Sequence, residues 1–199
     1  MMKKEFSFYE FVALIVPASI LLFGAYLILK FYKRIELIDF SSLGETLIFI
    51  IVCYGVGHLI QAIGNLFEKL IWFVYGGMPT KWLSNPNRFK KVLFEPQLNQ
   101  DILQKVQSKF GAKYDDYGKL TYNLLFQAGK TARIDIFNGS YSLFRGLSVS
   151  FILLTGMVCY YSNWQYSSFA FMGFVLLTRR MIRFGHYYAT EIFITFYNM

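Results

Sequence analysis

The sequence predicts an all-α protein, a four-span transmembrane helical bundle with a small cytoplasmic helical insertion. Hydrophobic residues make up 55% of the 199 residues and charged residues only 16%, below the roughly 25% of soluble domains. Uncharged runs of 19, 22 and 33 residues begin at Phe11, Thr46 and Gly146. About 20 apolar residues cross a bilayer as a helix, so the third run is long enough for two spans.

Three consecutive segments are expected along the chain. They are an N-terminal transmembrane hairpin (1–77), a basic cytoplasmic helical insertion (78–133) and a second transmembrane hairpin with a basic aromatic C-terminal segment (134–199). The insertion holds ten Lys or Arg against four Asp or Glu. Basic segments stay on the cytoplasmic side of a membrane, so the insertion and both termini are expected in the cytoplasm of a bacterium, with the spans in its inner membrane.

Helix boundaries follow from charges and helix-breaking residues. In the first hairpin the predicted helices cover about 11–31, with Pro17 inside, and about 43–75, followed by Gly76-Gly77; Ser41 or Ser42 is a candidate cap for the second. The third helix is expected to run to about 161 and to begin as early as Gly118. The polar residues 162–168 indicate a turn, and the fourth helix is expected from about 166. Apolar spacing also predicts amphipathic helices around 98–106 and 120–128 of the insertion. The first span lacks a small-residue cleavage site, which favours a retained helix over a cleaved signal peptide.

A polar stripe interrupts the second predicted helix. Its members recur at spacings of four and three and are Tyr54, His58, Gln61, Asn65 and Glu68. On a helix these residues fall within an arc of about 80°, and a membrane helix must shield such a stripe from lipid. Two interpretations stay open: polar contacts in the bundle interior, or the lining of a pore built by several copies. The second hairpin is expected to cover Asn65 and Glu68, which leaves Tyr54 and His58 for a pore.

Two groups mark the start of the third span. A row of small residues spaced by four predicts a helix-packing face and consists of Ser142, Gly146 and Ser150. An interface ion-pair cluster is predicted from Arg133, Asp135, Asn138 and Arg145. Asp135 and Arg145 are positioned to pair with Glu68 and Lys69 across helices, which indicates a clamp and not a reactive site.

The C-terminal segment carries the weak catalytic candidates Arg180 and His186. Their spacing is that of the R-x5-H motif of HEPN-type ribonucleases, although Met181 stands where that family usually has a polar residue. The alternative is a basic juxtamembrane run, formed by Arg179, Arg180 and Arg183, beside a solvated histidine. Two histidines and two separated cysteines predict no metal site, and we expect no cofactor.

Residues 57–65 with Gly76-Gly77, residues 133–145 and residues 179–189 together resemble a family. It comprises small multi-pass bacterial membrane proteins of defence loci, including the membrane accessory proteins of type VI-B CRISPR systems. The resemblance implies an inner-membrane accessory effector of antiviral defence that acts as an oligomeric pore or permeabilises the membrane, with an RNA-guided effector as partner. The alternatives are a membrane-anchored adaptor for a cytoplasmic protein and the HEPN-like ribonuclease, so an enzyme is not favoured. Lipid-facing Lys and Arg account for the net charge of +8, and direct nucleic-acid binding is not expected.

Overall fold

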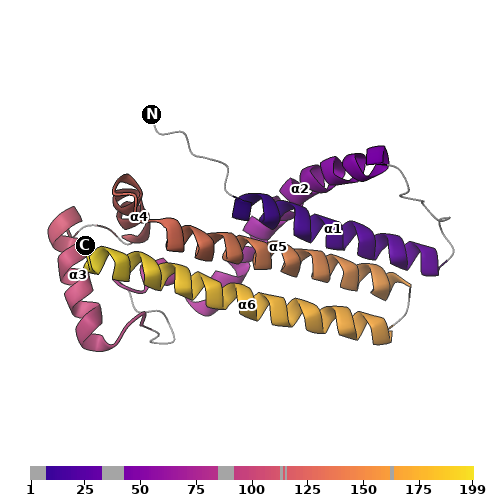
Figure 1. Cartoon of the computed structure of the whole chain (residues 1–199). Helices are drawn as coiled ribbons and strands as arrows, with labels where there is room; N and C mark the ends of the chain where they lie inside the picture. Colours follow the sequence, from indigo (N-terminus) through magenta and orange to yellow (C-terminus); the bar gives the residue numbers. More distant parts are fainter. Residues whose placement is uncertain (1–7, 33–42, 85–91, 113, 115, 162–163) are drawn as a thin grey trace. The chain divides into compact units, whose positions relative to one another are not determined.

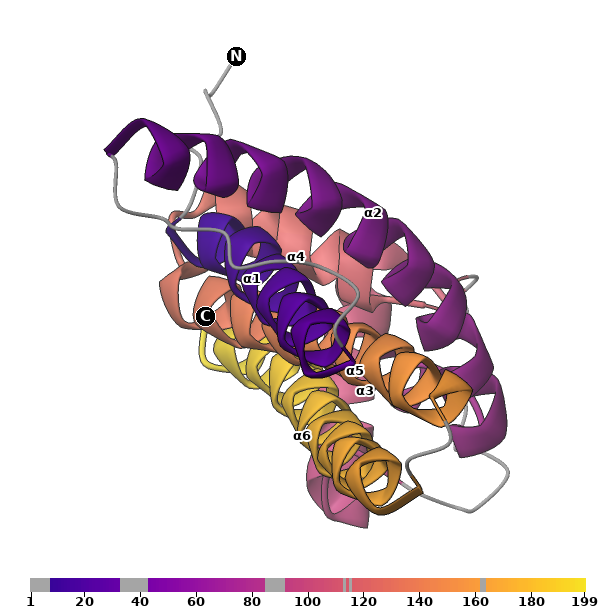
Figure 2. The ribbon, with the colours of Figure 1, turned by 90° about the vertical axis from the view of Figure 1, so that its right-hand side faces the viewer.

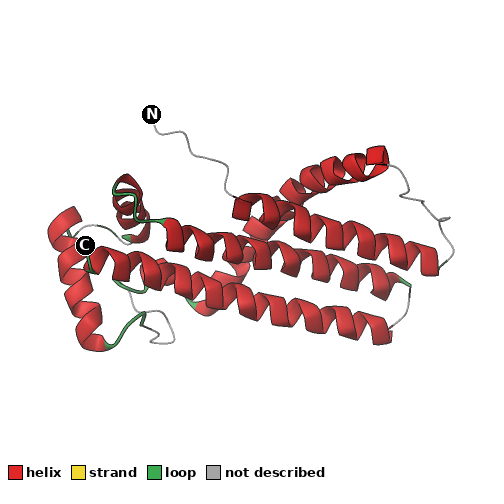
Figure 3. Cartoon of the chain, viewed as in Figure 1, coloured by secondary structure: helices red, strands yellow, loops and turns green. Residues whose placement is uncertain are grey.

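The computed structural model describes residues 8–32, 43–84, 92–112, 114, 116–161 and 164–199. These residues fold into helices joined by loops, so the all-α prediction is confirmed (Figures 1 and 3). The elements are α1 (Phe8–Phe31), α2 (Leu43–Tyr75), the 3-10 helix η1 (Pro79–Lys81), α3 (Pro96–Phe110), α4 (Gly118–Gln127), α5 (Ala132–Tyr160) and α6 (Trp164–Tyr197). The candidate caps Ser41 and Ser42 lie outside the described residues.

Three of the described helices are long and apolar enough to cross a membrane. They are the segments Phe11–Phe31 of α1, Leu43–Val74 of α2 and Ala132–Tyr160 of α5. Helix α6 is not among them, because the polar residues of its first turns and the pair Arg179-Arg180 lower its mean hydropathy. The fold is therefore that of a helical membrane protein, and three spans are supported by length and composition.

Two helix boundaries differ from those predicted. The segment from Gly118 is a separate helix and not the start of the third span, because Gly129 adopts φ +68° and ends α4 before α5 begins. The predicted turn over 162–168 is helical from Trp164 onward. The Ser168 hydroxyl donates to the Trp164 carbonyl at 2.8 Å, which satisfies this polar side chain inside a helix.

The chain forms two compact units. Unit 1 comprises Met1–Phe67 and Ser142–Met181, and unit 2 comprises Glu68–Tyr141 and Ile182–Met199. Helices α2, α5 and α6 each contribute residues to both units. The predicted division into three segments groups residues along the sequence, whereas the units combine segments from distant parts of the chain.

The core of unit 1 lies where α1, α2 and α5 meet. Its buried residues are Ala18, Cys53, Ile60 and Val149. A Cβ atom at Gly57 would lie 2.5 Å from the carbonyl oxygen of Leu14, so α1 and α2 approach through their backbones. Likewise a Cβ at Gly146 would lie 2.8 Å from the Pro17 ring, and α1 lies alongside α5 in this unit (Figure 2). The predicted small-residue packing face on α5 is thereby confirmed.

Two buried indoles contact each other in unit 2. Trp72 donates to the hydroxyl of Tyr141 at 2.8 Å, and Trp82 donates to the carbonyl of Gly77 at 3.1 Å. The amphipathic helices predicted in the insertion are observed as α3 and α4, and apolar residues of both are buried in unit 2. Fully buried side chains of the unit include Ile102 and Val106 of α3, Leu125 of α4, Ile134 of α5, and Ile192 and Phe193 of α6.

Candidate functional site

The polar stripe of α2 divides into a half-buried side and an exposed side. The half-buried members are Gln61 and Glu68, and the exposed members are Tyr54, His58 and Asn65. At about 100° per residue, Gln61 lies about 80° around the helix from the buried Cys53, whereas His58 lies about 140° away. The exposure of each member of the stripe therefore follows its angle around the axis of α2. The expectation that Asn65 is covered is therefore wrong, because Asn65 lies on the side of the stripe that faces away from the core.

Gln61 is the centre of a polar network within unit 1. Its Nε2 donates to the carbonyl oxygens of Ala13, at 2.9 Å, and Ser142, at 3.1 Å. Its Oε1 accepts from Arg145 through Nε at 3.2 Å and Nη2 at 2.8 Å. Both donor hydrogens and the acceptor of the amide are used, so one side chain connects α1, α2 and α5. Gln61 serves as polar glue of the bundle interior, one of the two interpretations above.

Pro17 explains why the carbonyl of Ala13 needs this partner. Proline has no backbone N–H, so the carbonyl four residues earlier in the helix loses its intrahelical hydrogen bond. In α1 that carbonyl belongs to Ala13, and Gln61 donates to it. Such freed carbonyls in membrane helices are satisfied by neighbouring helices. Sequence reasoning noted Pro17 and Gln61 separately and missed their connection, although the four-residue offset from Pro17 was readable.

The exposed side of the stripe lies among apolar side chains. Tyr54 and His58 contact each other edge to face, with ring centroids 4.8 Å apart. The exposed apolar residues of the surrounding part of α2 include Ile51, Leu59, Ile63 and Leu66. An imidazole and a carboxamide therefore stand on a surface whose composition suits lipid or a neighbouring membrane helix.

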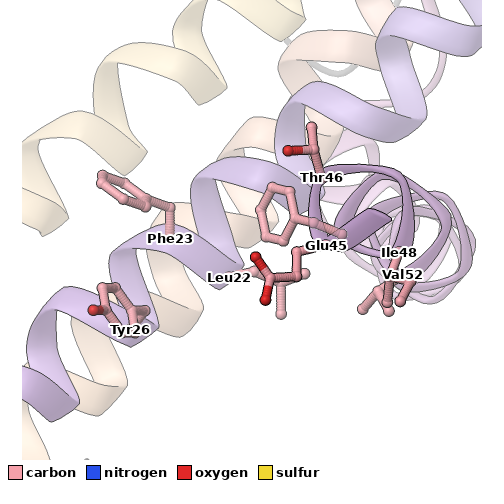
Figure 4. A pocket seen from close by; sticks show the side chains of 8 residues that line it. Leu22, Phe23, Tyr26, Glu45, Thr46, Ile48 and Val52 are labelled. Atoms are coloured by element: carbon pink, nitrogen blue, oxygen red, sulfur yellow. The ribbon is translucent and has the colours of Figure 1, made fainter. Parts of the chain in front are cut away.

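A cavity of about 500 Å³ lies between α1 and the first turns of α2 (Figure 4). Phe23 and Tyr26 reach it from α1, and Ile48 and Val52 from α2 (Figure 4). Among the described residues that line it, Glu45 carries the one carboxylate, Tyr26 and Thr46 carry hydroxyls, and the others are apolar. Such a lining suits contact with lipid chains and offers no constellation for catalysis.

The residues of the predicted ion-pair cluster make contacts that sequence reasoning did not foresee. In unit 2, Arg133 Nε lies 3.4 Å from the carboxylate of Glu191, with the arginine side chain 73% exposed. Asp135 accepts from the hydroxyl of Tyr122 at 2.7 Å, and Asn138 is exposed. In unit 1, Arg145 bonds to Gln61. Arg145 thus belongs to the hydrogen-bond network of the polar stripe.

The residues of the R-x5-H spacing have different surroundings. In unit 1, the guanidinium of Arg180 lies 5.7 Å from the centre of the Phe144 ring, and Met181 is fully buried. In unit 2, the centroids of the His186 and Trp82 rings are 6.0 Å apart, and His186 Nδ1 lies 3.4 Å from the Thr190 hydroxyl. Met181, the departure from the ribonuclease pattern, is explained by packing in the core.

Unit 2 contains a second cavity, of about 530 Å³, that sequence reasoning missed. It is lined by Tyr75, Trp82, Val92, Ile182, Arg183, His186 and Tyr187. Arg183 and His186 are three residues apart on α6, which places both on one helical face. The other walls come from α2, from the residues after η1 and from Val92, so no local sequence pattern could have indicated the cavity.

Tyr188 is the strongly perturbed titratable group of unit 2. Burial, followed by the negative charges of Asp135 and Asp116, raises the pKa of Tyr188 from 10.0 to about 12. Asp116 also accepts from the Gly118 N–H at 2.9 Å at the start of α4. Deprotonation of the phenol would add a third negative charge beside Asp135 and Asp116, so Tyr188 is suited to packing as a neutral side chain.

The chain matches no protein-family model, no curated protein and no solved structure. Its class therefore rests on the fold and the site. They define an all-helical membrane protein with an internally satisfied polar network and polar side chains on the outer face of a membrane helix.

Proposed function

We propose that the protein is a multi-pass inner-membrane effector that oligomerises and forms a pore or permeabilises the membrane. The observation that carries this proposal is the exposure of His58 and Asn65 on the apolar outer surface of α2. A polar group placed in hydrocarbon without a hydrogen-bond partner costs about 2 kcal/mol or more. Water in a pore, or a polar group of another copy, removes that cost.

The hydrogen bonds of Gln61 explain why the face of α2 that carries His58 and Asn65 points outward. Because Gln61 is bonded to both α1 and α5, α2 has a fixed rotation about its axis within unit 1. The outward orientation of His58 and Asn65 is then a property of the folded protomer. Three or four helices of one chain enclose too little space for an aqueous path, so several copies must surround it.

We also propose how the chain crosses the membrane and in which biological setting it acts. Helix α6 is the fourth span, its arginines reach the inner interface, and the insertion and both termini are cytoplasmic. The resemblance to membrane accessory proteins of type VI-B CRISPR systems supplies antiviral defence as the setting and an RNA-guided effector as the partner.

Ion flux through reconstituted protein tests the pore. The full chain is placed in liposomes with a potassium gradient, and a potential-sensitive dye reports the flux. The double variant His58→Leu/Asn65→Leu should fold and should lose most of the flux. Gln165→Leu, which removes an exposed polar side chain from α6, is the matched control and should keep it. Equal flux in wild type and in the well-folded double variant would remove His58 and Asn65 from the path.

Cysteine labelling tests whether the stripe contacts water. Cys159 is exposed and is replaced first by Cys159→Ser, while the native Cys53 is buried. A membrane-impermeant thiol reagent should then modify His58→Cys and Asn65→Cys but not Leu59→Cys, which lies on the same helix. Modification of all three positions, or of Leu59→Cys alone, would contradict an aqueous path along the stripe.

An adaptor function is the second candidate, favoured by the basic exposed surface of the insertion. Its exposed lysines include Lys105 and Lys109 of α3 and Lys119 of α4. A docked acidic partner should lose affinity after charge reversal at these lysines, with ion flux absent throughout. The ribonuclease alternative stays a prediction, and it requires RNA cleavage that disappears in His186→Ala.

A further inference from the structure

Aromatic side chains form much of the lining of the cavity in unit 2. Trp82 is only 3% exposed, and its indole N–H already donates to the Gly77 carbonyl at 3.1 Å. Trp82 is covered by the rings of Trp72 and His186, so the ring surface that a ligand can reach belongs to Tyr75 and Tyr187. The volume of about 530 Å³ falls in the range of sites for small organic molecules, roughly 300–1,000 Å³.

The same cavity is cationic at its rim. The side chain of Arg183 is exposed there, and His186 stands on the same face of α6 against the Trp82 ring. None of the described residues that line the cavity is Asp or Glu. An anionic ligand would therefore meet donors at the rim and no opposing carboxylate on the walls.

The walls favour a flat ligand over a lipid chain. Rings from Tyr75, Trp82 and Tyr187 outnumber the two aliphatic side chains, those of Val92 and Ile182. Aromatic faces bind planar rings by stacking, which contributes about 1–3 kcal/mol per base in nucleic-acid complexes. Arginine in turn pairs with phosphate through two parallel hydrogen bonds.

We propose that this cavity binds a small organic phosphate of the mononucleotide class. The phosphate lies against Arg183 and His186 at the rim, and the base lies against the rings of Tyr75 and Tyr187. None of the described residues that line the cavity belongs to the polar stripe of α2, so the proposed site stands whether or not the protein forms a pore. It gives unit 2 a ligand, which neither the sequence patterns nor the proposed pore assigns.

Fluorescence anisotropy with the full chain in detergent tests this site, using AMP that carries a methylanthraniloyl group as the probe. Wild type should bind the probe saturably, and unlabelled AMP should compete. Arg183→Gln should weaken binding about tenfold or more, the loss typical of one charge-assisted contact. Arg179→Gln removes the same charge from an exposed arginine that does not line the cavity, and it should change the affinity less than about twofold.

A second variant covers the case in which Arg183→Gln does not fold. Tyr187 is 44% exposed, so Tyr187→Ala should fold, and it should also weaken binding by removing a ring from the wall. Absence of saturable binding by wild type overturns the proposal, as does equal affinity in Arg183→Gln and Arg179→Gln. Competition by nanodiscs of phosphatidylglycerol without competition by AMP overturns it too, because the cavity would then hold a lipid headgroup.

Discussion

Replacing Gln61 by leucine tests whether a single amide holds α1, α2 and α5 together. The change keeps a side chain of similar size in α2 and removes the amide at the centre of the network. The carbonyls of Ala13 and Ser142 lose a donor, and Arg145 loses one acceptor. Asn65→Leu is the matched control, because it removes the same functional group from an exposed position four residues along the helix.

The expected cost follows from the number and kind of these bonds. Hydrogen bonds between membrane helices average about 0.6 kcal/mol, so the two bonds to carbonyls contribute about 1 kcal/mol. Bonds to a charged group contribute about 1.5–3 kcal/mol, which applies to the paired contact with Arg145. Gln61→Leu should therefore lower the free energy of unfolding by about 3 kcal/mol, whereas Asn65→Leu should lower it by less than about 0.5 kcal/mol.

Pro17 provides an internal check on this mechanism. Pro17→Ala restores the backbone N–H that the Ala13 carbonyl lacks, so the bond from Gln61 becomes dispensable. Gln61→Leu should then cost less in the Pro17→Ala background than in wild type, by about 0.5–1 kcal/mol. A proline that acts only by bending α1 would leave the cost of Gln61→Leu unchanged.

Unfolding in mixed micelles of increasing sodium dodecyl sulfate, followed by tryptophan fluorescence, measures these differences. The double variant Gln61→Leu/Arg145→Leu completes a cycle with the two single variants, and we expect a coupling energy of about 1.5–3 kcal/mol. A coupling energy near zero, or an equal loss of stability in Gln61→Leu and Asn65→Leu, would refute the network as the element that joins the three helices.

Three further predictions concern packing and titration. Gly57→Ala should destabilise the protein by about 1–3 kcal/mol because its Cβ would meet the Leu14 backbone, whereas Gly55→Ala, with nothing within 4 Å, should stabilise it by up to about 1 kcal/mol in the same unfolding assay. Tyr141→Phe should cost about 1–3 kcal/mol by leaving a buried indole N–H without its acceptor, and an unchanged unfolding midpoint would contradict that bond. The raised pKa of Tyr188 leaves stability unaffected below pH 10 and removes about 2 kcal/mol as pH rises from 10 to 12, because the unfolded chain releases this proton first. Tyr188→Phe should flatten that part of the curve of unfolding free energy against pH, and an equal slope in the variant would assign the loss to other groups.

Local patterns were sufficient to predict most of the helices. The second helix was expected over about 43–75 and is observed over Leu43–Tyr75, because an uncharged run and the Gly76-Gly77 pair mark its body and its end. Apolar residues at helical spacing predicted α3 and α4, because such spacing places them on one face of a helix. Polar residues misled the prediction at Trp164–Ser168, where the Ser168 hydroxyl bonds within the helix and a polar composition does not imply a turn.

By itself, the sequence determined the helical class, the apolar segments and the existence of a polar stripe, because these depend on composition and on a period of 3.6 residues. Only the tertiary structure decided which face of α2 is buried, since the contact of Gly57 with α1 and the bonds of Gln61 set the rotation of that helix. It also decided that Arg183, and not Arg180, shares a cavity with His186. Both outcomes depend on contacts between residues far apart in the chain, and no local spacing encodes them.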